Sequence, residues 1–252
     1  MVAASSTGRR EPPAFRRLTV SRLQWLGPRM IRVTVDGGEL SGFEIEQPAA
    51  SIRLLIPAPG STELVIPRWN GNEFLLDDGS RPVIRTFTPR DLTPRGLDLD
   101  IVIHPGGAVS SWVENAHPGS KAAVSGPGRG YGIDQAASGL VLVGDETAIP
   151  AISQLLEHLR RPADVHLAVH NRFGRVELPQ KSDVNVVWHE LSDPGKMGEV
   201  MVAALGMTEL ESKPIWCAGE AAAMQEVRTY LLEEMGIPRS RATVRGYWKA
   251  RE

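Results

Sequence analysis

The segment Arg85-Thr86-Phe87-Thr88-Pro89-Arg90 puts an arginine, an aromatic ring and hydroxyl groups near the end of an expected strand. That strand covers Val83–Phe87, and Pro89 stops it because proline cannot donate to a ladder. Alternation along a strand sends Arg85 and Phe87 to one face and Thr86 and Thr88 to the other. The pattern is typical of a strand in an antiparallel β-barrel.

A glycine turn, Gly107-Ala108-Val109-Ser110, follows closely, and its serine is expected to open a short helix over Ser110–Asn115. A helix start offers free backbone N–H groups and the positive end of a dipole, which together suit a phosphate. An arginine that grips phosphate with two hydrogen bonds, a stacking ring and an anion site are what a flavin dinucleotide requires. The alternative is an ordinary strand and turn in a barrel, and these two segments alone do not exclude it.

The second half of the chain alternates short apolar strands with helical stretches, which is typical of a parallel sheet with right-handed crossovers. One strand runs into Gly144-Asp145-Glu146-Thr147, and apolar residues at helical spacing follow it. The segment Ile215-Trp216-Cys217-Ala218-Gly219-Glu220 repeats this scheme and leads into an expected helix over Ala221–Met235. Strand, tight turn and helix form the half-unit of nucleotide-binding folds.

These patterns predict a two-domain β plus α/β protein, with an antiparallel barrel of the six-stranded type over residues 15–132 and a parallel-sheet α/β domain over residues 139–252. The expected strands of the barrel are Leu18–Trp25, Met30–Val35, Ile52–Ile56, Val83–Phe87, Leu97–His104 and Ala122–Val124. Those of the second domain are Leu140–Val143, Val165–His170, Val184–Trp188 and Pro214–Cys217. An irregular excursion is expected over Gly60–Pro82 and a linker over Gly126–Ser138.

Composition narrows the class of protein. The 252 residues carry a net charge of −2, so there is no basic field for nucleic acid and no charge argument for a membrane surface. No apolar run reaches the roughly 20 residues of a membrane helix, and the first dozen residues lack the apolar core of a signal peptide, so we expect a cytoplasmic protein. With one cysteine and six scattered histidines, neither a disulfide nor a resident metal is expected.

The order and spacing of these segments resemble the siderophore-interacting proteins, the flavin-dependent ferric-siderophore reductases of the ferredoxin reductase superfamily. The resemblance rests on Arg85–Arg90, Ile103-His104 with Gly107–Trp112, Gly126-Pro127, Gly144–Pro150, Gly219-Glu220 and the closing Gly246-Tyr247-Trp248-Lys249. It implies a barrel that binds FAD, a C-terminal domain that binds NADPH or NADH, and reduction of the iron in an anionic ferric siderophore.

The resemblance also assigns site residues. It implies that Arg85 binds the FAD pyrophosphate, that Phe87 packs on the flavin and that Thr88 hydrogen-bonds its ring edge. The family usually has tyrosine where Phe87 stands, so one hydrogen bond is in doubt. The other expected cofactor contacts are Thr86, Val102, His104, Gly107, Ala108, Val109, Ser110, Gly144, Asp145, Glu146, Thr147, Arg172, Arg175, Gly219, Glu220 and Trp248. The alternatives are a barrel-end histidine satisfied by the backbone for His104 and a plain helix cap for Ser110.

Two carboxylates, Asp145 and Glu146, stand where related reductases carry a glycine-rich nucleotide loop. Because carboxylates repel a pyrophosphate, we expect this loop to bind a nucleotide less tightly. Asp145 or Thr147 could cap the helix that follows. The alternative for both carboxylates is that they complement the helix dipole at a solvated N-terminus. For Cys217, a buried core position is the more common outcome.

Two basic groups are expected to contact ligands. Arg245, Lys249 and Arg251 are the candidate siderophore contacts, and a frayed, solvated basic tail is the alternative. Arg172 and Arg175 follow the second strand of the α/β domain with no acid beside them. Since an acid there holds the ribose diol of NAD and an arginine accommodates the 2′-phosphate of NADP, we predict NADPH, with a solvated basic loop as the alternative.

Two further functions stay open from the sequence. One is a flavin reductase of the same fold that acts on another acceptor, such as an electron-carrier protein. The other is a binding module that has lost its cofactor and only sequesters a siderophore. An iron-chelate reduction assay separates the first from a siderophore reductase, and the colour of the purified protein separates the second.

Overall fold

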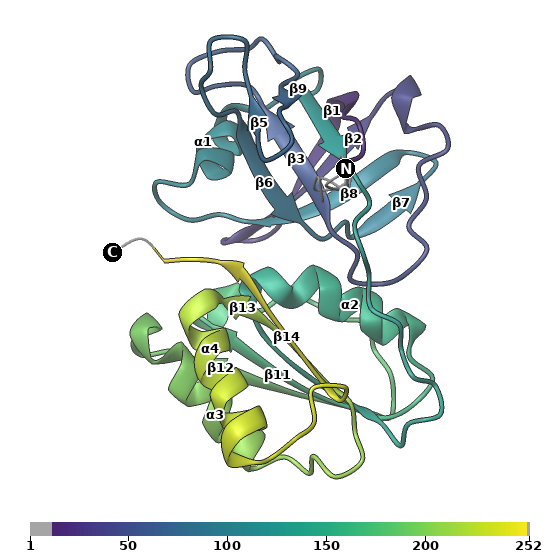
Figure 1. The fold of residues 1–252 in the computed structure, drawn as a ribbon, viewed down its shortest axis with the longest axis vertical. Coiled ribbons are helices and arrows are strands. Elements are labelled where there is room, and N and C mark those ends of the chain that lie inside the picture. Colours follow the sequence, from purple (N-terminus) through teal and green to yellow (C-terminus); the bar gives the residue numbers. More distant parts are fainter. Residues whose placement is uncertain (1–11, 251–252) are drawn as a thin grey trace, which may run out of the picture.

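The computed structural model of the protein describes residues 12–250 and shows two domains stacked along the long axis of the molecule (Figure 1). Antiparallel strands build the N-terminal domain, and a parallel sheet flanked by helices builds the C-terminal domain. The predicted β plus α/β architecture is therefore confirmed, while the domain limits 15–132 and 139–252 stay a prediction.

The N-terminal domain is a curled, barrel-like sheet of seven strands in the order β6-β3-β9-β1-β2-β8-β7. Six of them correspond to the expected strands, and the short β7 adds an edge. Their bounds are β1 (Arg16–Gly27), β2 (Met30–Asp36), β3 (Ile52–Ile56), β6 (Val83–Phe87), β7 (Asp91–Thr93), β8 (Gly96–Val102) and β9 (Lys121–Ser125), with helix α1 (Ala108–Asn115) after β8 and a 3-10 turn, η1 (Gly38–Leu40), after β2.

Side-chain alternation explains why β8 lies in this sheet. Leu97, Leu99 and Ile101 are buried in the barrel core, while the acidic residues between them lie on the other face of the strand, where Asp100 is buried against Arg32. Asp100 accepts two hydrogen bonds from the Arg32 guanidinium, at 2.7 and 2.8 Å, across the β2–β8 pair. One face of the strand therefore packs on the core, and the other face forms a cross-strand ion pair.

The excursion between β3 and β6 is largely irregular, as predicted, but it contains a small ribbon of β4 (Arg68–Trp69) and β5 (Phe74–Leu75). The ring of Phe74 anchors this ribbon, since its centroid lies 5.2 Å from that of Phe15 and 5.0 Å from that of Trp69.

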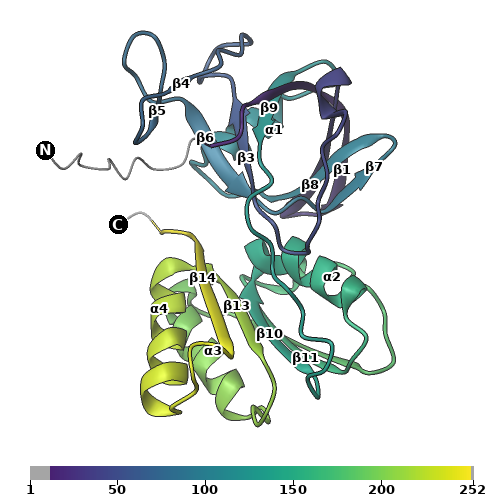
Figure 2. The same cartoon turned by 45° about the vertical axis from the view of Figure 1, so that its right-hand side comes forward.

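The C-terminal domain is a five-stranded sheet in the order β12-β11-β10-β13-β14, and all its pairs are parallel. Helix α2 lies between this sheet and the barrel, whereas α3 and α4 cover the opposite face (Figures 1 and 2). The bounds are β10 (Leu140–Asp145), β11 (Ala163–Val169), β12 (Val184–Glu190), β13 (Ile215–Glu220), β14 (Ala242–Trp248), α2 (Ile149–His158), α3 (Met197–Gly206) and α4 (Ala221–Thr229), with short turns η2 (Glu146–Ala148), η3 (Arg172–Gly174), η4 (Pro194–Lys196) and η5 (Tyr230–Glu234). Within residues 12–250, none of the helices is long and apolar enough to cross a membrane.

Three local expectations need correction. The C-terminal segment is not a frayed tail up to Trp248, because it forms β14 and pairs along β13. The helix expected over Ala221–Met235 changes at Tyr230 from α4 into the π-helical turn η5. Helix α1 begins at Ala108 with Gly107 as its N-cap, so Ser110 lies inside the first turn and does not open the helix.

The two domains share a packed interface. Met30 and Ala49 from the barrel belong to the same hydrophobic cluster as the buried face of α2. The Arg29 Nε group lies 3.0 Å from Glu146 Oε2, and the Arg90 guanidinium meets the Glu157 carboxylate at 2.5 and 3.1 Å. Gln154 on α2 adds a hydrogen bond from the Ala49 N–H at 2.8 Å. Apolar contact and paired charges together fix how one domain sits on the other.

Candidate functional site

The candidate site lies where the carboxyl ends of the parallel strands face the barrel. Strand β10 ends at Asp145, β13 at Glu220 and β14 at Trp248. In open α/β sheets this edge is where ligands bind, because successive strands end there in loops that lead to helix N-termini. Three buried carboxylates, those of Asp145, Glu146 and Glu220, lie at this edge.

Asp145 is the centre of the carboxyl edge. Its Oδ1 accepts hydrogen bonds from Thr147 N at 2.8 Å and from Thr147 Oγ1 at 2.5 Å. Its Oδ2 accepts from Glu220 N at 2.9 Å and from Trp248 Nε1 at 2.8 Å. One side chain therefore joins the ends of three strands.

This carboxylate is almost completely buried, with 2% of its surface exposed. Burial raises the pKa of Asp145, and the hydrogen bonds from Thr147, Trp248 and Glu220 oppose that rise. Three of the four partner groups, Thr147 N, Glu220 N and Trp248 Nε1, can only donate, so this arrangement suits the ionised form. Gly219 makes the room, since a Cβ there would lie 2.8 Å from Asp145 Oδ2.

The neighbouring acids are also buried and bound by the protein. Glu146 accepts from Arg29 and from the His170 N–H at 2.9 Å. Glu220 caps α4 by accepting from Ala222 N and Ala223 N, at 2.5 and 2.9 Å, and its other oxygen accepts from Ala250 N at 3.2 Å. The helix N-termini at this edge are thus satisfied from within the chain.

The alternative of a solvated N-terminus for Asp145 and Glu146 is therefore wrong, because both side chains are buried. The expected capping by Asp145 is confirmed, although it caps the turn η2 that precedes α2. Gly144 allows close packing of strand and helix, since a Cβ there would lie 2.4 Å from Ala148 Cβ. The role of Gly144, Asp145, Glu146, Thr147, Gly219 and Glu220 as cofactor contacts stays a prediction.

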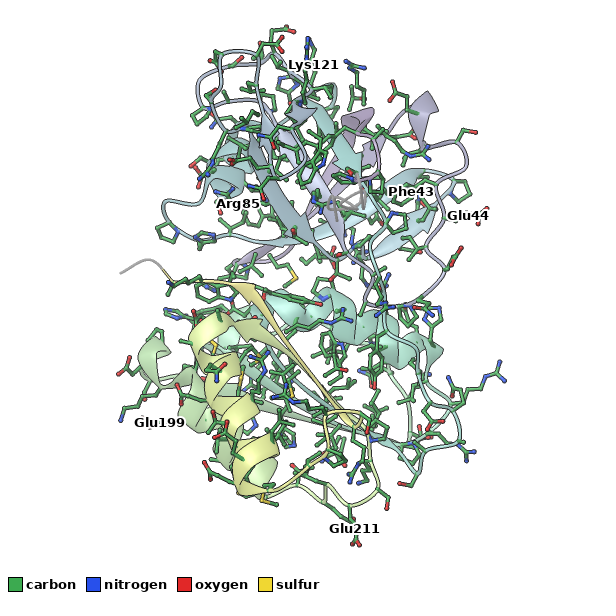
Figure 3. All side chains as sticks on the ribbon, viewed as in Figure 1. Phe43, Glu44, Arg85, Lys121, Glu199 and Glu211 are labelled. Carbon is green, nitrogen blue, oxygen red and sulfur yellow. The ribbon has the colours of Figure 1, made fainter. Side chains whose placement is uncertain are left out.

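On the barrel, β6 carries the predicted flavin residues. Val83 and Phe87 pack on the barrel core, and Ile84 packs on the opposite cluster, as alternation requires. Arg85 and Thr86 are exposed, and Arg85 projects at the surface of this domain (Figure 3). The Arg85 guanidinium donates to the Ile84 carbonyl at 2.8 Å, and within the described residues no carboxylate pairs with it. It is available to an anionic ligand.

The turn before α1 is tightly built. The His104 N–H donates to Ser110 Oγ at 3.1 Å, and a Cβ on Gly107 would lie 2.6 Å from His104 Cε1. Only glycine allows the His104 ring to lie against this turn. His104 is exposed and Val102 half-buried, Ala108 lies in the first turn of α1, and Val109 and Ser110 are buried. A phosphate would therefore meet this turn at the exposed residues 104–106 and the half-buried Ala108, and would not reach the buried Ser110 side chain without movement.

The barrel motif and the C-terminal strand meet across the interface. Thr88 Oγ1 lies 3.5 Å from the Tyr247 hydroxyl, and burial raises the pKa of Tyr247. Arg245 donates to the carbonyls of Ala49 at 3.4 Å and Gly130 at 3.2 Å, both of which precede the parallel sheet in the chain. Sequence reasoning missed Tyr247 as an interface residue, although the quoted Gly246–Lys249 segment contains it. The sequence signal for this role is that Tyr247 follows Arg245 by two positions, so that on a strand both side chains lie on the same face.

The remaining predicted contacts lie at the surface. Arg172 stacks on Phe173, with its guanidinium carbon 4.9 Å from the ring centroid, while Arg175 pairs with Glu190 at 2.7 Å. Trp248 is 41% exposed despite its bond to Asp145, and Lys249 is exposed. Arg251 lies outside the described residues.

The potential metal ligands and the single cysteine complete the description of the site. Across residues 12–250, no group of three or more histidine, cysteine or acidic side chains lies close enough to hold a metal ion. Cys217 is fully buried in the core beneath α3 and α4, as the more common outcome predicted, and burial raises the pKa of its thiol.

Known proteins resemble this chain over nearly its full length. A family model described as "Siderophore-interacting FAD-binding domain" matches residues 19–131, and one described as "Siderophore-interacting protein" matches residues 137–251. The ferric vibriobactin reductase ViuB of Vibrio cholerae is 28% identical over 246 residues, which cover 93% of this chain and 89% of that protein. The NADPH-dependent ferric-chelate reductase of Escherichia coli is 26% identical and covers 94% of both chains.

Solved structures agree with these matches. The crystal structure of a siderophore utilization protein from T. fusca superposes with a TM-score of 0.85 and 29% identity, over 96% of this chain and 95% of that one. A ferredoxin reductase of carbazole 1,9a-dioxygenase, at 16% identity and a TM-score of 0.64, shares the fold over 95% of this chain and 71% of its own. The resemblance found in the sequence is thereby confirmed.

The Asp145 hub predicts a specific pattern of stability loss. Asp145→Asn puts an NH₂ group where one oxygen accepts two hydrogen bonds, so two buried donors lose their acceptor. At about 1–3 kcal/mol for each unsatisfied group, partly offset by removal of a buried charge, we expect a loss of about 2–4 kcal/mol in the free energy of unfolding. Urea unfolding measures it, and hydrogen exchange should rise in β14.

Trp248→Phe is the matched control, because it removes one donor and leaves the carboxylate with three hydrogen bonds. It should cost about 1 kcal/mol. An asparagine variant as stable as the wild type, or less affected than the phenylalanine variant, would contradict the role given to Asp145.

Proposed function

The chain belongs to the siderophore-interacting protein family, and from this premise we propose that it reduces the iron of a ferric siderophore with electrons from NAD(P)H, using FAD. Reduced iron binds hard oxygen chelators less tightly, so reduction releases it. The substrate is an anionic ferric chelate. The proposal needs no paired carboxylates or nucleophilic triad, because the cofactors carry the electron transfer and the protein supplies binding and orientation.

The observation that carries the proposal is the meeting of two predicted segments. Thr88 belongs to the predicted flavin motif of the barrel, and Tyr247 belongs to the C-terminal segment predicted to face the siderophore. The Thr88 hydroxyl lies 3.5 Å from the Tyr247 hydroxyl. These residues are 159 positions apart in the chain. An isoalloxazine ring held by the first segment would therefore lie next to the second, where an external electron acceptor can approach.

The residues of the barrel fit an FAD pyrophosphate. Arg85 is exposed, carries no acidic partner among the described residues, and has most of its N–H donors free for phosphate oxygens. The N-cap of α1 is Gly107, which has no side chain and so cannot accept a hydrogen bond from the N–H groups of the first helical turn. When bound, FAD supplies the ability to accept a hydride and to pass on single electrons.

The nicotinamide donor would bind at the carboxyl edge. Carboxylates already satisfy the helix N-termini after β10 and β13, which leaves less of this edge for a pyrophosphate. The loop after β11 instead offers the cation of Arg172, held over the ring of Phe173. We infer that this loop gives much of the affinity for the donor and that Arg172 contacts its 2′-phosphate.

Lys249 is the candidate substrate contact that the structure leaves free. It follows β14 directly and is exposed, and within residues 12–250 its ammonium group has no acidic partner. Arg245 is engaged with carbonyls of the barrel and serves the interface instead. We propose that Lys249, with Arg251 beyond the described residues, attracts the anionic chelate to the end of β14.

Arg85→Ala should leave folded protein that has lost most of its FAD. Removing charge-assisted hydrogen bonds of about 1.5–3 kcal/mol weakens binding about ten- to a hundredfold. Flavin content after dialysis measures the effect. In the wild type, an anaerobic visible spectrum should lose its oxidised-flavin absorbance on addition of NADPH and regain it on addition of a ferric siderophore.

Arg22→Ala is the control, since Arg22 is an exposed arginine on β1 of the same domain. It should keep its flavin. Full flavin content in Arg85→Ala would refute the assignment of Arg85, whereas a wild-type spectrum that a ferric siderophore does not restore would refute the proposed reaction.

Lys249→Ala should raise the KM for an anionic ferric chelate and leave flavin content unchanged. An exposed charge is worth up to about 1 kcal/mol, so we expect an increase of up to about fivefold at low salt. The effect should shrink at physiological ionic strength, where screening acts over about 8 Å. Steady-state kinetics at two salt concentrations measures it.

Arg160→Ala is the matched control. This exposed arginine follows the C-terminal end of α2 and precedes the start of β11, so it lies at the amino ends of the parallel strands, away from the carboxyl edge. It should keep the wild-type KM. If Lys249→Ala behaved like Arg160→Ala at low salt, Lys249 would have no part in substrate attraction.

Arg172→Glu should lower kcat/KM for NADPH about tenfold or more and change the value for NADH little, because it replaces the predicted phosphate contact by a repelling charge. Arg175→Glu should have the smaller effect, since Arg175 is already paired with Glu190. Turnover with each donor, measured with one ferric chelate, tests both. A wild type that uses the two donors equally would overturn the predicted preference.

A further inference from the structure

A second cationic hollow lies on the C-terminal domain, at the open edge of β14. It has a volume of about 370 Å³ and is lined by Arg228, Leu232, Arg239, Ala242 and Val244. Ala242 opens β14 and the candidate redox site is at its other end, which is about 20 Å away at roughly 3.3 Å per residue. The hollow is therefore separate from the site described above.

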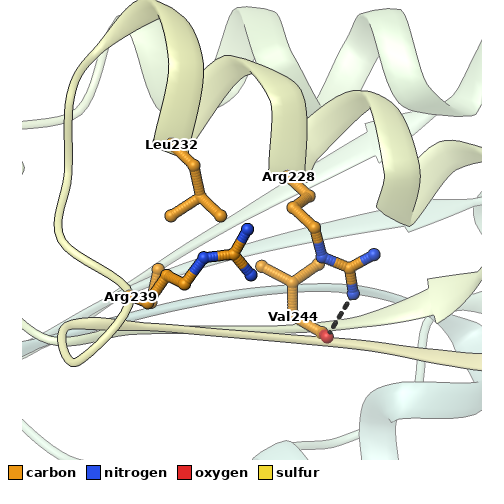
Figure 4. Close-up of a pocket in the computed structure, with 5 residues that line it drawn as sticks. Arg228, Leu232, Arg239 and Val244 are labelled. Atoms are coloured by element: carbon orange, nitrogen blue, oxygen red, sulfur yellow. Dashed lines mark hydrogen bonds between the residues drawn. The ribbon is translucent and has the colours of Figure 1, made fainter.

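Two guanidinium groups share this hollow without an acid. Arg228 on α4 is held by Gln225 Oε1 at 3.0 Å and by the Val244 carbonyl at 2.9 Å. Arg239, in the loop before β14, is directed towards Arg228 (Figure 4), and in the described part of the chain its side chain has no hydrogen bond or ion pair. Both groups carry a positive charge, so they repel each other in the absence of a ligand.

The backbone of β14 adds donors to the same hollow. Ile215 N donates to the Arg241 carbonyl, which therefore faces β13. Because strand residues alternate, the N–H and C=O groups of Ala242 and Val244 face the open edge, and the bond from Arg228 to the Val244 carbonyl agrees with this. An oxyanion in the hollow would meet guanidinium forks and backbone N–H groups together.

Leu232 on η5, with Ala242 and Val244 on β14, completes the lining of the hollow, and Figure 4 shows Leu232 and Val244 on either side of the Arg239 guanidinium. The lining is mostly polar, so charge and hydrogen bonds dominate what the hollow offers a ligand, and the aliphatic residues add a small apolar contact. Arginine forks match the planar or tetrahedral oxygens of carboxylate and phosphate.

We propose that this hollow binds a small molecule bearing a carboxylate or phosphate group, held between Arg228 and Arg239. The proposal does not depend on the reductase function, because it concerns a site at the other end of β14. The two guanidinium groups supply charge and hydrogen bonds, and the volume of about 370 Å³ suits a compact ligand.

Isothermal titration of the full-length, FAD-loaded protein with succinate and, separately, with inorganic phosphate tests the proposal at constant ionic strength. Saturable binding of at least one probe is expected below about 10 mM, and the probe that binds tells carboxylate from phosphate. Arg239→Gln should weaken that binding about tenfold or more, and the double variant Arg228→Gln/Arg239→Gln should abolish it. Arg239→Lys, which keeps the charge and loses the fork, should fall between wild type and Arg239→Gln.

Arg95→Gln is the control for charge, because Arg95 is an exposed arginine on the other domain and the change in net charge is the same. It should bind like the wild type. Circular dichroism and thermal unfolding establish that each variant is folded, which the exposure of Arg239 favours. Absence of saturable binding to either probe, or binding that survives in the double variant, would overturn the proposal.

Discussion

The carboxylate of Asp145 accepts four hydrogen bonds, and the arrangement of the carboxyl edge depends on them. Strand β14 lies at the edge of the sheet, so β13 is the one strand that pairs with it in the described chain. The bond from Trp248 to Asp145 adds a second attachment at its carboxyl end. Because β14 also carries Tyr247 and Arg245 to the barrel, the buried acid orders the sheet edge and the domain interface together.

The same edge shows how acids change a nucleotide-binding scaffold. A helix N-terminus attracts phosphate only while its N–H groups are free. Here Asp145 satisfies the turn before α2, and Glu220 satisfies the start of α4. The positive ends of both helices are therefore used within the protein. We infer that a dinucleotide at this edge takes its phosphate contacts from side chains and loops, and the cations after β11 stay the predicted contacts.

Much of the fold could be predicted from local patterns, because alternation and turn chemistry act over a few residues. The hairpin of β1 and β2 and the parallel strands around Asp145 are examples, and the family match confirms the expected FAD-binding half. Strand β14 was missed because its residues are half-buried on both faces and show no clear period. The pairing of Arg29 with Glu146 joins residues 117 apart, which no local pattern encodes. Whether Arg85 holds the pyrophosphate stays a prediction.

Arg245 shows why residue type alone does not settle a role. A basic residue near the chain end was expected to meet an anionic substrate, yet its guanidinium donates to the carbonyls of Ala49 and Gly130. It also forms a hydrogen bond with the Tyr247 hydroxyl that opposes the effect of burial on the pKa of that phenol. A cation placed this way fixes the distance between the barrel and β14. Arg245 therefore contributes to the packing of the two domains, and the attraction of an anionic substrate stays a predicted role of Lys249.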